Sequence, residues 1–552
     1  MNKTMLWAAL GLCAAVHVYA EPLTQISAGH IYTQDPHQPV VESMLVDSTR
    51  GIVVALGTRE QMAQRAPAAK RLDLGTASVI PGLVDAHGHL LNQGLSMARA
   101  DLVGTKSKAG VIERLQAKAV DLGPDSWLLG RGWDQNDWPV AEFPTAADLD
   151  AAFPDRPVFL RRVDGHAAWA NSRALASTAK DLSGNWQPEG GRILRDAQGQ
   201  ATGVFIDAAI ALIAKQVPIP SDAEMRQAFL TAMNEAASLG LTGVHDMGIS
   251  LRQFEVLRKL DQTEGLPIRV YAHADGDAAA LQALCGLGTV GAAGDRLQLR
   301  AVKMYVDGAL GSRGARLLED YSDEPGNRGL WLTEPARFEE LVRRASDCGL
   351  QIATHAIGDG ANRMVLDTYA RVKGDALPAA RWRIEHAQIV TPKDLARFAE
   401  LGVIASMQPT HATSDMPWVP ARLGPNRISG AYAWKTLLNS GARMAFGSDF
   451  PVEAVSPLLG LYAAMSRQDL DQQPPGGWLP EQRLSLAEAV AAFTTGAAYA
   501  SFQEGQLGRL SPGFQADFVV FGSDPFDADA RSVVDLAVRQ TWVAGQQMYP
   551  QR

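Results

Sequence analysis

Cysteine is scarce in this chain, with three residues in 552. Cys13 lies in an N-terminal leader described below, so Cys285 and Cys348 are left. Two cysteines do not form the disulfide framework of a small exported domain, and their spacing is not that of a zinc-thiolate site. Whether these two pair stays open at this point. A metal site in this chain would have to use histidine, aspartate and lysine.

Positive charge is also in deficit. The chain has 51 Lys and Arg against 60 Asp and Glu, a formal net charge of -9. Loss of Lys3 with the leader changes this charge by one, to -10. An acidic chain without a basic run is a poor partner for nucleic acid or an anionic membrane surface, so we expect neither.

Long apolar runs are missing beyond the first twenty residues. Those residues combine a positive Lys3, an apolar stretch Met5–Val16 and the small-x-small pattern Val18–Ala20. This pattern is typical of a signal peptide, and its apolar part is too short to span a bilayer. We predict a signal peptide over residues 1–20, export to the periplasm or medium, and no membrane span in the mature form.

What the chain does contain is a motif, V-I-P-G-L-V-D-A-H-G-H-L-L, over Val79–Leu91. Its apolar run predicts a buried strand, and His87 and His89 follow where that strand ends. In an extended segment alternate side chains share one face, so both imidazoles can reach one metal ion. Taken alone, the pair is as readily two polar residues in a loop.

Seven further strand-like runs follow, most of them with a helical pattern behind them. Strands that alternate with helices favour parallel βα units, and eight units predict a (β/α)8 TIM barrel over residues 79–504. Helices are expected at Glu334–Cys348, Asn362–Val372, Pro392–Leu401 and Ser485–Tyr499, the last beginning with a Ser485 and Glu488 capping box.

The two ends of the chain read as strands and turns. We predict that residues 21–78 and 505–552 combine into one small β-sandwich domain, although two separate β domains fit the pattern as well. Residues 92–240 interrupt the barrel after its first strand and are rich in Trp, Pro and Gly. We interpret them as an insertion that covers the substrate, because loops on a barrel carry substrate contacts.

Four more polar residues stand at or just after predicted barrel strands: Lys303, His355, His386 and Asp449. Any one histidine or aspartate at a strand end can simply cap the next helix. A lysine within an apolar strand is harder to dismiss, because a buried ammonium must find a partner or lose its charge. Together with His87 and His89, six such residues at one barrel mouth indicate a shared metal site.

With this pattern the chain resembles the metal-dependent amidohydrolase superfamily, over nearly its whole mature length. It is most similar to the amidohydrolase family 3 branch that contains N-substituted formamide deformylases. The segments that carry this similarity are Val306–Ala315, Glu385–Gln388 and Gly447–Val452. The resemblance implies an enzyme that hydrolyses a non-peptide carbon–nitrogen bond of a small amide-type substrate.

The resemblance also implies one or two divalent ions, most often zinc. His87 and His89 would hold the first ion, and His355 and His386 the second. Lys303 would be carbamylated, so that a carboxylate rather than a cation bridges the ions. Asp449 would bind the first ion and carry a proton from the attacking water to the leaving nitrogen.

Further polar residues are candidates for substrate binding. They are His166, Trp133 and Asp134 in the insertion, and Asp307, Arg313 and His411 after the fourth and seventh barrel strands. For Trp133, packing in a core is at least as good an interpretation. His245 and His273 match no ligand of the family, and we take them as structural.

Other functions stay open on the same fold. A deaminase, an ester or lactone hydrolase and a decarboxylase are alternatives, because one barrel supports many reactions. A catalytically silent binding protein is a further alternative, but all six ligand positions are filled. The substrate and the oligomeric state, a homodimer included, are not determined by the sequence.

Overall fold

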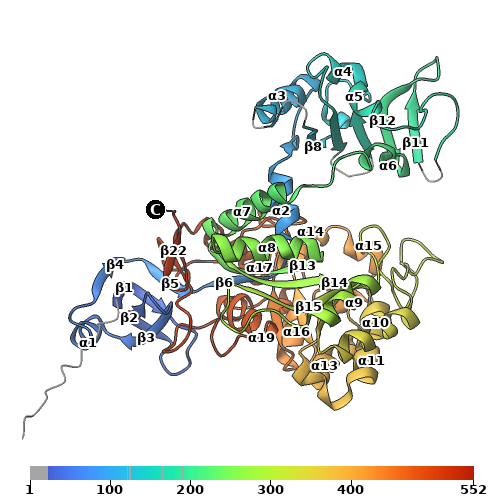
Figure 1. The fold of residues 1–552 in the computed structure, drawn as a ribbon. Coiled ribbons are helices and arrows are strands. Elements are labelled where there is room, and N and C mark those ends of the chain that lie inside the picture. Colours follow the sequence, from blue (N-terminus) through green and yellow to red (C-terminus); the bar gives the residue numbers. More distant parts are fainter. Residues whose placement is uncertain (1–22, 121, 124–125, 163–166, 189–190, 552) are drawn as a thin grey trace, which may run out of the picture.

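The computed structural model describes residues 23–551, apart from residues 121, 124–125, 163–166 and 189–190. The predicted signal peptide lies outside the described residues. In the described part the strands build three sheets: a barrel, a small β domain and an insertion (Figure 1). No helix of this part is long and apolar enough to cross a membrane.

The largest body is a barrel of eight parallel strands, whose order is β19-β18-β17-β16-β15-β14-β13-β6. The strands are β6 (Leu83–Gly88), β13 (Leu241–Ile249), β14 (Arg269–Asp275), β15 (Leu297–Tyr305), β16 (Gln351–Ala356), β17 (Arg383–His386), β18 (Ile404–Met407) and β19 (Met444–Phe446). Each strand pairs with the one before it in this series, so all their carboxyl ends meet at one mouth. The predicted (β/α)8 barrel is confirmed.

Helices cover the outside of the barrel and bury its strands (Figure 1). They include α7 (Asp222–Ser238), α8 (Leu251–Thr263), α9 (Ala278–Leu287), α10 (Pro335–Asp347), α11 (Asp359–Lys373), α13 (Pro392–Leu401), α16 (Trp434–Asn439) and α17 (Pro457–Ser466). Three of the four expected helices agree within a few residues. The fourth begins with the expected Ser485 and Glu488 capping box but contains a π-helical turn, so it divides into α18 (Leu486–Ala491) and α19 (Ala497–Ala500).

The barrel closes between its first and last strands through Asp85. The buried Asp85 carboxylate accepts hydrogen bonds from the Ser448 hydroxyl at 2.6 Å and from the backbone N–H groups of His87 and Ser448. The backbone N–H of Asp449 donates to the carbonyl of His87 at 2.7 Å. A Cβ atom at Gly447 would lie 2.5 Å from Asp85, so only glycine fits this closure. The same contacts fix His87 and Asp449 side by side.

Strands from both chain ends share the second sheet, in the order β22-β21-β20-β5-β1-β2-β3, with β4 paired to β1. They are β1 (Leu23–Tyr32), β2 (Val40–Asp47), β3 (Ile52–Gly57), β4 (Lys70–Asp73), β5 (Ser78–Pro81), β20 (Phe518–Phe521), β21 (Val538–Val543) and β22 (Gln546–Tyr549). An apolar core that includes Ile26, Val79 and Phe518 lies against this sheet.

The boundary between this sheet and the barrel lies at Gly82. Val79 and Ile80, which the apolar run places in the first barrel strand, belong to β5 and pair antiparallel with β20. The barrel strand begins at Leu83. A Cβ atom at Gly82 would meet the Thr242 side chain at 2.2 Å, so the chain crosses from one sheet to the other at a glycine.

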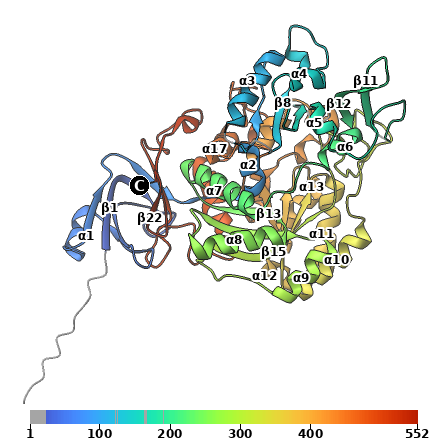
Figure 2. The same cartoon turned by 45° about the horizontal axis from the view of Figure 1, so that its top comes forward.

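The insertion is a body with its own sheet, β11-β12-β10-β9-β8-β7. Its strands are β7 (Ala100–Asp101), β8 (Leu128–Trp133), β9 (Val158–Arg162), β10 (Ala167–Ala170), β11 (Gly191–Arg195) and β12 (Ala201–Asp207). It stands off the barrel beyond α2 (Leu90–Met97) and α7, apart from the small β domain (Figures 1 and 2). Two apolar clusters, around Trp169 and around Phe205, form its core.

Candidate metal centre

One cavity of about 410 Å³ opens at the mouth of the barrel. Its walls include all six residues that the sequence predicts as metal ligands: His87, His89, Lys303, His355, His386 and Asp449. His87, Lys303, His355 and His386 lie in β6, β15, β16 and β17, His89 directly follows β6, and Asp449 lies in the turn after β19. The parallel strands bring them together because each side chain stands where its strand ends.

Two groups in this cavity have ligand atoms close enough to hold an ion. The first is His87, His89 and Asp449, in which the Asp449 Oδ1 atom lies 3.0 Å from His89 Nε2 and 3.4 Å from His87 Nε2. The second is His386, His411 and Asp449. Asp449 belongs to both, and its two oxygen atoms can therefore serve two neighbouring ions.

The second group differs from the set that the resemblance implies. His411, a substrate candidate in the sequence, joins His386, and its Nε2 lies 3.8 Å from Asp449 Oδ2. His355 lies beside them, since its ring packs edge to face on His386 at 4.6 Å between centroids. Within the described residues, the buried Nε2 atoms of His355 and His411 have no hydrogen-bond partner. Buried imidazole nitrogens without a partner fit a metal ion.

The opposite nitrogen of three imidazoles is held by the protein. His87 Nδ1 lies 2.6 Å from Glu385 Oε2, His89 Nδ1 lies 2.9 Å from the Met247 carbonyl, and His386 Nδ1 lies 2.8 Å from Gln408 Oε1. These contacts turn each Nε2 toward the cavity, as is usual for histidine ligands of metals. Burial lowers the pKa of His87 to about 4, so its imidazole is neutral at pH 7 and can bind a cation.

Lys303 lies between the two groups. Its Nζ atom is 3.1 Å from His87 Nε2, and its side chain is buried. Burial lowers the pKa of Lys303 to about 8, although the Glu385 and Asp449 carboxylates act in the other direction. The ammonium form still predominates at neutral pH, but the neutral amine is far more populated than in an exposed lysine.

The backbone is strained at two of the predicted ligands. His386 and Asp449 have φ values of 75° and 63°, in the left-handed region that non-glycine residues seldom adopt. At His386 this conformation ends β17 and turns the imidazole into the cavity, one residue after Glu385. Strain of this kind persists only where the surrounding structure enforces it and is common at functional sites.

The structure places the predicted substrate-binding residues in different parts of the molecule. His166 lies outside the described residues. Trp133 is fully buried in the core of the insertion, where its Nε1 donates to the Leu160 carbonyl, and Asp134 follows it there. No described residue between 92 and 240 lines the cavity of the metal centre. His411 does line it.

Asp307 and Arg313 have structural partners. Asp307 is buried and accepts hydrogen bonds from three backbone N–H groups, among them those of Ile357 and Gly358. It thereby joins the ends of β15 and β16. Arg313 forms an ion pair of 3.0 Å with Asp323. Neither residue lines the cavity.

His245 and His273 lie inside the barrel, where Arg383 Nη1 contacts His245 Nδ1 at 2.8 Å.

Several cavity residues were not predicted. Glu385 and Gln408 contact the Nδ1 atoms of His87 and His386 on the side away from the cavity. Tyr305, Asp415, Trp418 and Glu453 line the cavity itself. A signal for two of them exists in the sequence, because Asp415 and Trp418 follow His411 by four and seven residues. This spacing places side chains on one face of a helix.

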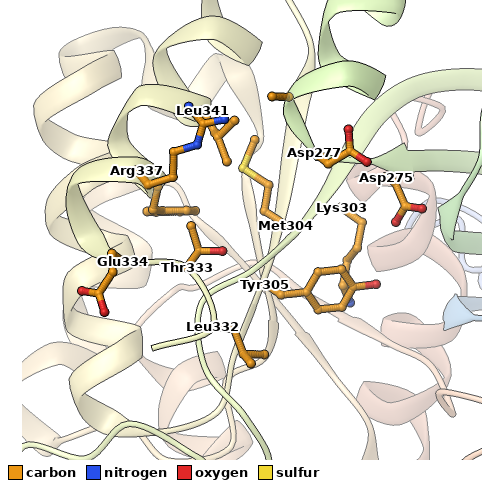
Figure 3. Close-up of a pocket in the computed structure, with 13 residues that line it drawn as sticks. Asp275, Asp277, Lys303, Met304, Tyr305, Leu332, Thr333, Glu334, Arg337 and Leu341 are labelled. Atoms are coloured by element: carbon orange, nitrogen blue, oxygen red, sulfur yellow. The ribbon is translucent and has the colours of Figure 1, made fainter. Parts of the chain in front are cut away.

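A second cavity of about 590 Å³ lies next to the first and shares Lys303 and Tyr305 with it. Figure 3 shows these two residues on one wall, across from Glu334 and Arg337 at the beginning of α10. Asp275 and Asp277 stand above them. This second cavity contains none of the histidines of the metal centre.

Comparison with known proteins agrees with this geometry. A family model described as "Amidohydrolase family" matches residues 70–549. The chain is 35% identical over 542 residues to the protein LONG AFTER FAR-RED 3 of Arabidopsis thaliana, covering 95% of this chain and 91% of that protein. It is 27% identical over 538 residues to an N-substituted formamide deformylase of Arthrobacter pascens, covering 94% and 96%.

A solved structure has the same architecture. The crystal structure of an uncharacterized metal-dependent hydrolase from Pyrococcus horikoshii OT3 superimposes with a TM-score of 0.78 at 28% sequence identity. The match covers 92% of this chain and 99% of that chain. It therefore includes the barrel, the insertion and the small β domain.

Proposed function

Because this chain belongs to the amidohydrolase family, we propose that it hydrolyses a non-peptide amide bond of a small molecule. It is a metal-dependent hydrolase, like the Pyrococcus protein that shares its architecture. The observation that carries the proposal is the pair of histidine groups that share Asp449 at the barrel mouth. The similarity to an N-substituted formamide deformylase supports an amide as substrate.

The residues of the cavity suit a divalent ion of the zinc type, because imidazole nitrogens and a carboxylate are ligands that zinc prefers. His87, His89 and Asp449 would hold one ion, and His386 with His355 or His411 a second. A divalent ion held there lowers the pKa of a water molecule and polarises a carbonyl group.

Asp449 is the residue that we assign to proton transfer. Burial by itself raises the pKa of Asp449, but the adjacent His87 and His89 outweigh it and hold the pKa well below its usual range. The carboxylate is therefore ionised at neutral pH and can accept a proton from water. It stands at the cavity surface beside both ligand groups, and from there it can return the proton to the leaving nitrogen.

Lys303 is the residue that we assign to carbamylation. The neutral amine that its burial favours forms a bond from Nζ to the carbon of carbon dioxide and loses a proton. The product carries a negative charge where an ammonium would repel a metal ion. Its position beside His87 Nε2 supports a bridging role.

We also propose that the protein is exported. The sequence of residues 1–20 supports this, and so does a disulfide bond between Cys285 and Cys348, which joins α9 to the end of α10. Such bonds persist in oxidising compartments. Analysis of the N-terminus of the protein recovered from a periplasmic fraction tests it, and a chain that still begins with Met1 there would contradict it.

The test of function is hydrolysis of a panel of N-substituted formamides by purified protein of measured metal content. We expect turnover that a chelator abolishes and added zinc restores. Asp449→Asn should remove turnover, whereas Asp471→Asn, which changes an exposed aspartate in a loop, should not. Turnover by Asp449→Asn would contradict the assigned proton transfer, and metal-replete protein that is inactive on all amides would contradict the proposed function.

A further inference from the structure

The outer part of the metal-centre cavity has acidic and aromatic walls. One wall is built by α14 (Pro409–Asp415) and the turn after it, where His411, Asp415 and Trp418 all face the cavity. Asp415 stands one helical turn beyond His411, which corresponds to a rise of about 6 Å. The cavity therefore changes from metal ligands at its base to a carboxylate and an indole nearer its opening.

A second carboxylate comes from an adjoining segment of the wall. Glu453 follows Asp449 by four residues and lines the same cavity. The Ser414 hydroxyl donates to Glu453 Oε1 at 2.7 Å, which connects the two walls. The Tyr432 hydroxyl likewise donates to Asp415 Oδ2. Each carboxylate is held through one oxygen atom, and in the described part of the chain no donor reaches the other oxygen.

No lysine or arginine among the described residues forms an ion pair with Asp415 or Glu453. The two arginines on adjoining segments, Arg313 and Arg422, both pair with Asp323 instead. Lys303 lies at the base of the cavity, against His87. The carboxylates of Asp415 and Glu453 therefore have no ion-pair partner at the opening, and a bound cation would neutralise them.

This cavity is a ligand site on grounds other than its acidity. His411 is 7% exposed, and its Nε2, which has no hydrogen-bond partner within the described residues, belongs to the second metal group. Apolar side chains also line the cavity, among them Leu310, Ile357 and Trp418. They suit a spacer of hydrocarbon character. The Trp418 ring already has a cation beside it, because the Arg422 guanidinium lies 5.7 Å from the ring centroid, so Trp418 contributes an apolar wall.

We propose that Asp415 and Glu453, beside Trp418, form a subsite for a cationic group, and that the preferred substrates are amides in which an apolar spacer separates an ammonium group from the scissile carbonyl. This inference rests on the proposed amide hydrolysis and adds the substrate class. The subsite would disfavour substrates that carry a carboxylate in place of the ammonium group, because the negative charges of Asp415 and Glu453 would repel that carboxylate.

Two probes that differ in one group test the subsite: N-(para-aminomethylbenzyl)formamide, which carries an ammonium, and N-(para-ethylbenzyl)formamide, its neutral isostere. We expect kcat/KM to be about tenfold higher or more for the ammonium probe, in line with a hydrogen-bonded charge pair. Added salt should reduce this ratio, because part of the interaction is screened near the opening.

The variants are Glu453→Gln and Asp415→Asn, with Glu334→Gln as the matched control. Glu334 is exposed and lies in the neighbouring cavity, so its substitution removes one charge from the same barrel mouth without touching the subsite. We expect each subsite variant to lower the preference about threefold to tenfold, and Glu334→Gln to leave it unchanged. If Asp415→Asn fails to fold because its contact with Tyr432 is lost, the result for Glu453→Gln alone decides whether the subsite exists.

Two results would overturn the subsite: equal kcat/KM for both probes, or an equal loss of preference in Glu334→Gln and Glu453→Gln. If neither probe is hydrolysed, amide hydrolysis fails, and the subsite is decided by calorimetric binding of the two intact formamides. Tighter binding of the ammonium probe than of the neutral probe, lost in Glu453→Gln, supports the subsite. Equal binding refutes it.

Discussion

The Nδ1 atom of His87 lies 2.6 Å from the Oε2 atom of Glu385, and both side chains are fully buried. Arg383 donates two hydrogen bonds to the same carboxylate. Burial alone would raise the pKa of Glu385, but the interactions with Arg383 and His87 outweigh burial and hold the pKa well below its usual range. The charged Glu385 therefore keeps the proton of His87 on Nδ1 and leaves Nε2 for a metal ion.

From this contact we predict that Glu385→Gln weakens metal binding about tenfold to hundredfold, the usual effect of losing a carboxylate behind a histidine ligand. Competition with a chelator of known affinity measures the effect. Glu334→Gln serves as the control for loss of one charge. An unchanged metal affinity in Glu385→Gln would show that His87 is oriented without this carboxylate.

The closure of the barrel provides a second prediction. Asp85→Ala leaves buried N–H groups of His87 and Ser448 without their acceptor, so we expect a loss of about 3 kcal/mol in the free energy of unfolding. Ser448→Ala removes the hydroxyl, which donates to Asp85 and accepts from the Phe450 backbone N–H, and should cost less, about 1–2 kcal/mol. Urea unfolding of the two variants measures the difference, and equal losses would mean that the Asp85 carboxylate does not join the strands.

The barrel, and the meeting of the six predicted ligands at its mouth, could be predicted because both follow from local patterns. His87, Lys303, His355 and His386 end or nearly end strands, and parallel strands bring their carboxyl ends to one mouth. Glu385 could not be placed this way, since its role depends on His87, almost three hundred residues away in the chain. Contacts of this range have no local signal.

The insertion shows a different limit. Its tryptophans look like a substrate pocket in the sequence, yet Trp133, Trp138 and Trp169 pack against one another in the core of that body. An aromatic side chain fills a core or a pocket equally well, so composition alone does not separate the two. Val79 and Ile80 show the same ambiguity, because an apolar run fits a strand of either adjacent sheet.

The disulfide provides a third prediction. Cys285 and Cys348 are 63 residues apart, and closing a loop of this length restricts the unfolded chain. Replacing both by serine should lower the free energy of unfolding by about 2–4 kcal/mol, with turnover retained at low temperature. Thermal unfolding with and without reductant measures it. A variant as stable as the oxidised protein would show that the bond adds no stability.

The fourth prediction concerns pH and Asp394, at the beginning of α13. Burial alone raises the pKa of Asp394, but hydrogen bonds from Arg363, Arg397 and Thr391 outweigh it and place the pKa below its ordinary value. A carboxyl group with a lowered pKa stabilises the fold above its unfolded pKa, about 3.9, and this contribution is lost as the pH falls through the lower folded value.

Asp394→Asn should therefore be less stable than the parent protein by about 1–3 kcal/mol near neutral pH, and the difference should shrink below about pH 4. Urea unfolding of both proteins across this range measures it. Asp367→Asn, which removes an exposed partner of Arg397, is the control and should have a smaller effect. A difference that does not depend on pH would show that the ionised form of Asp394 is not what stabilises α13.

The last prediction tests the chemical state of Lys303. If its amine is carbamylated, the group that contacts the ions is a carboxylate, and Lys303→Ala leaves room for a small carboxylate from solution. We expect this variant to lose metal and turnover and to regain part of both in the presence of short-chain carboxylic acids. Short-chain alkylamines are the matched control, because they replace a free ammonium rather than a carbamate. Rescue by the amines and not by the acids would show that Lys303 acts as an amine, and a single ion per chain would then be expected, since nothing would remain to bridge two.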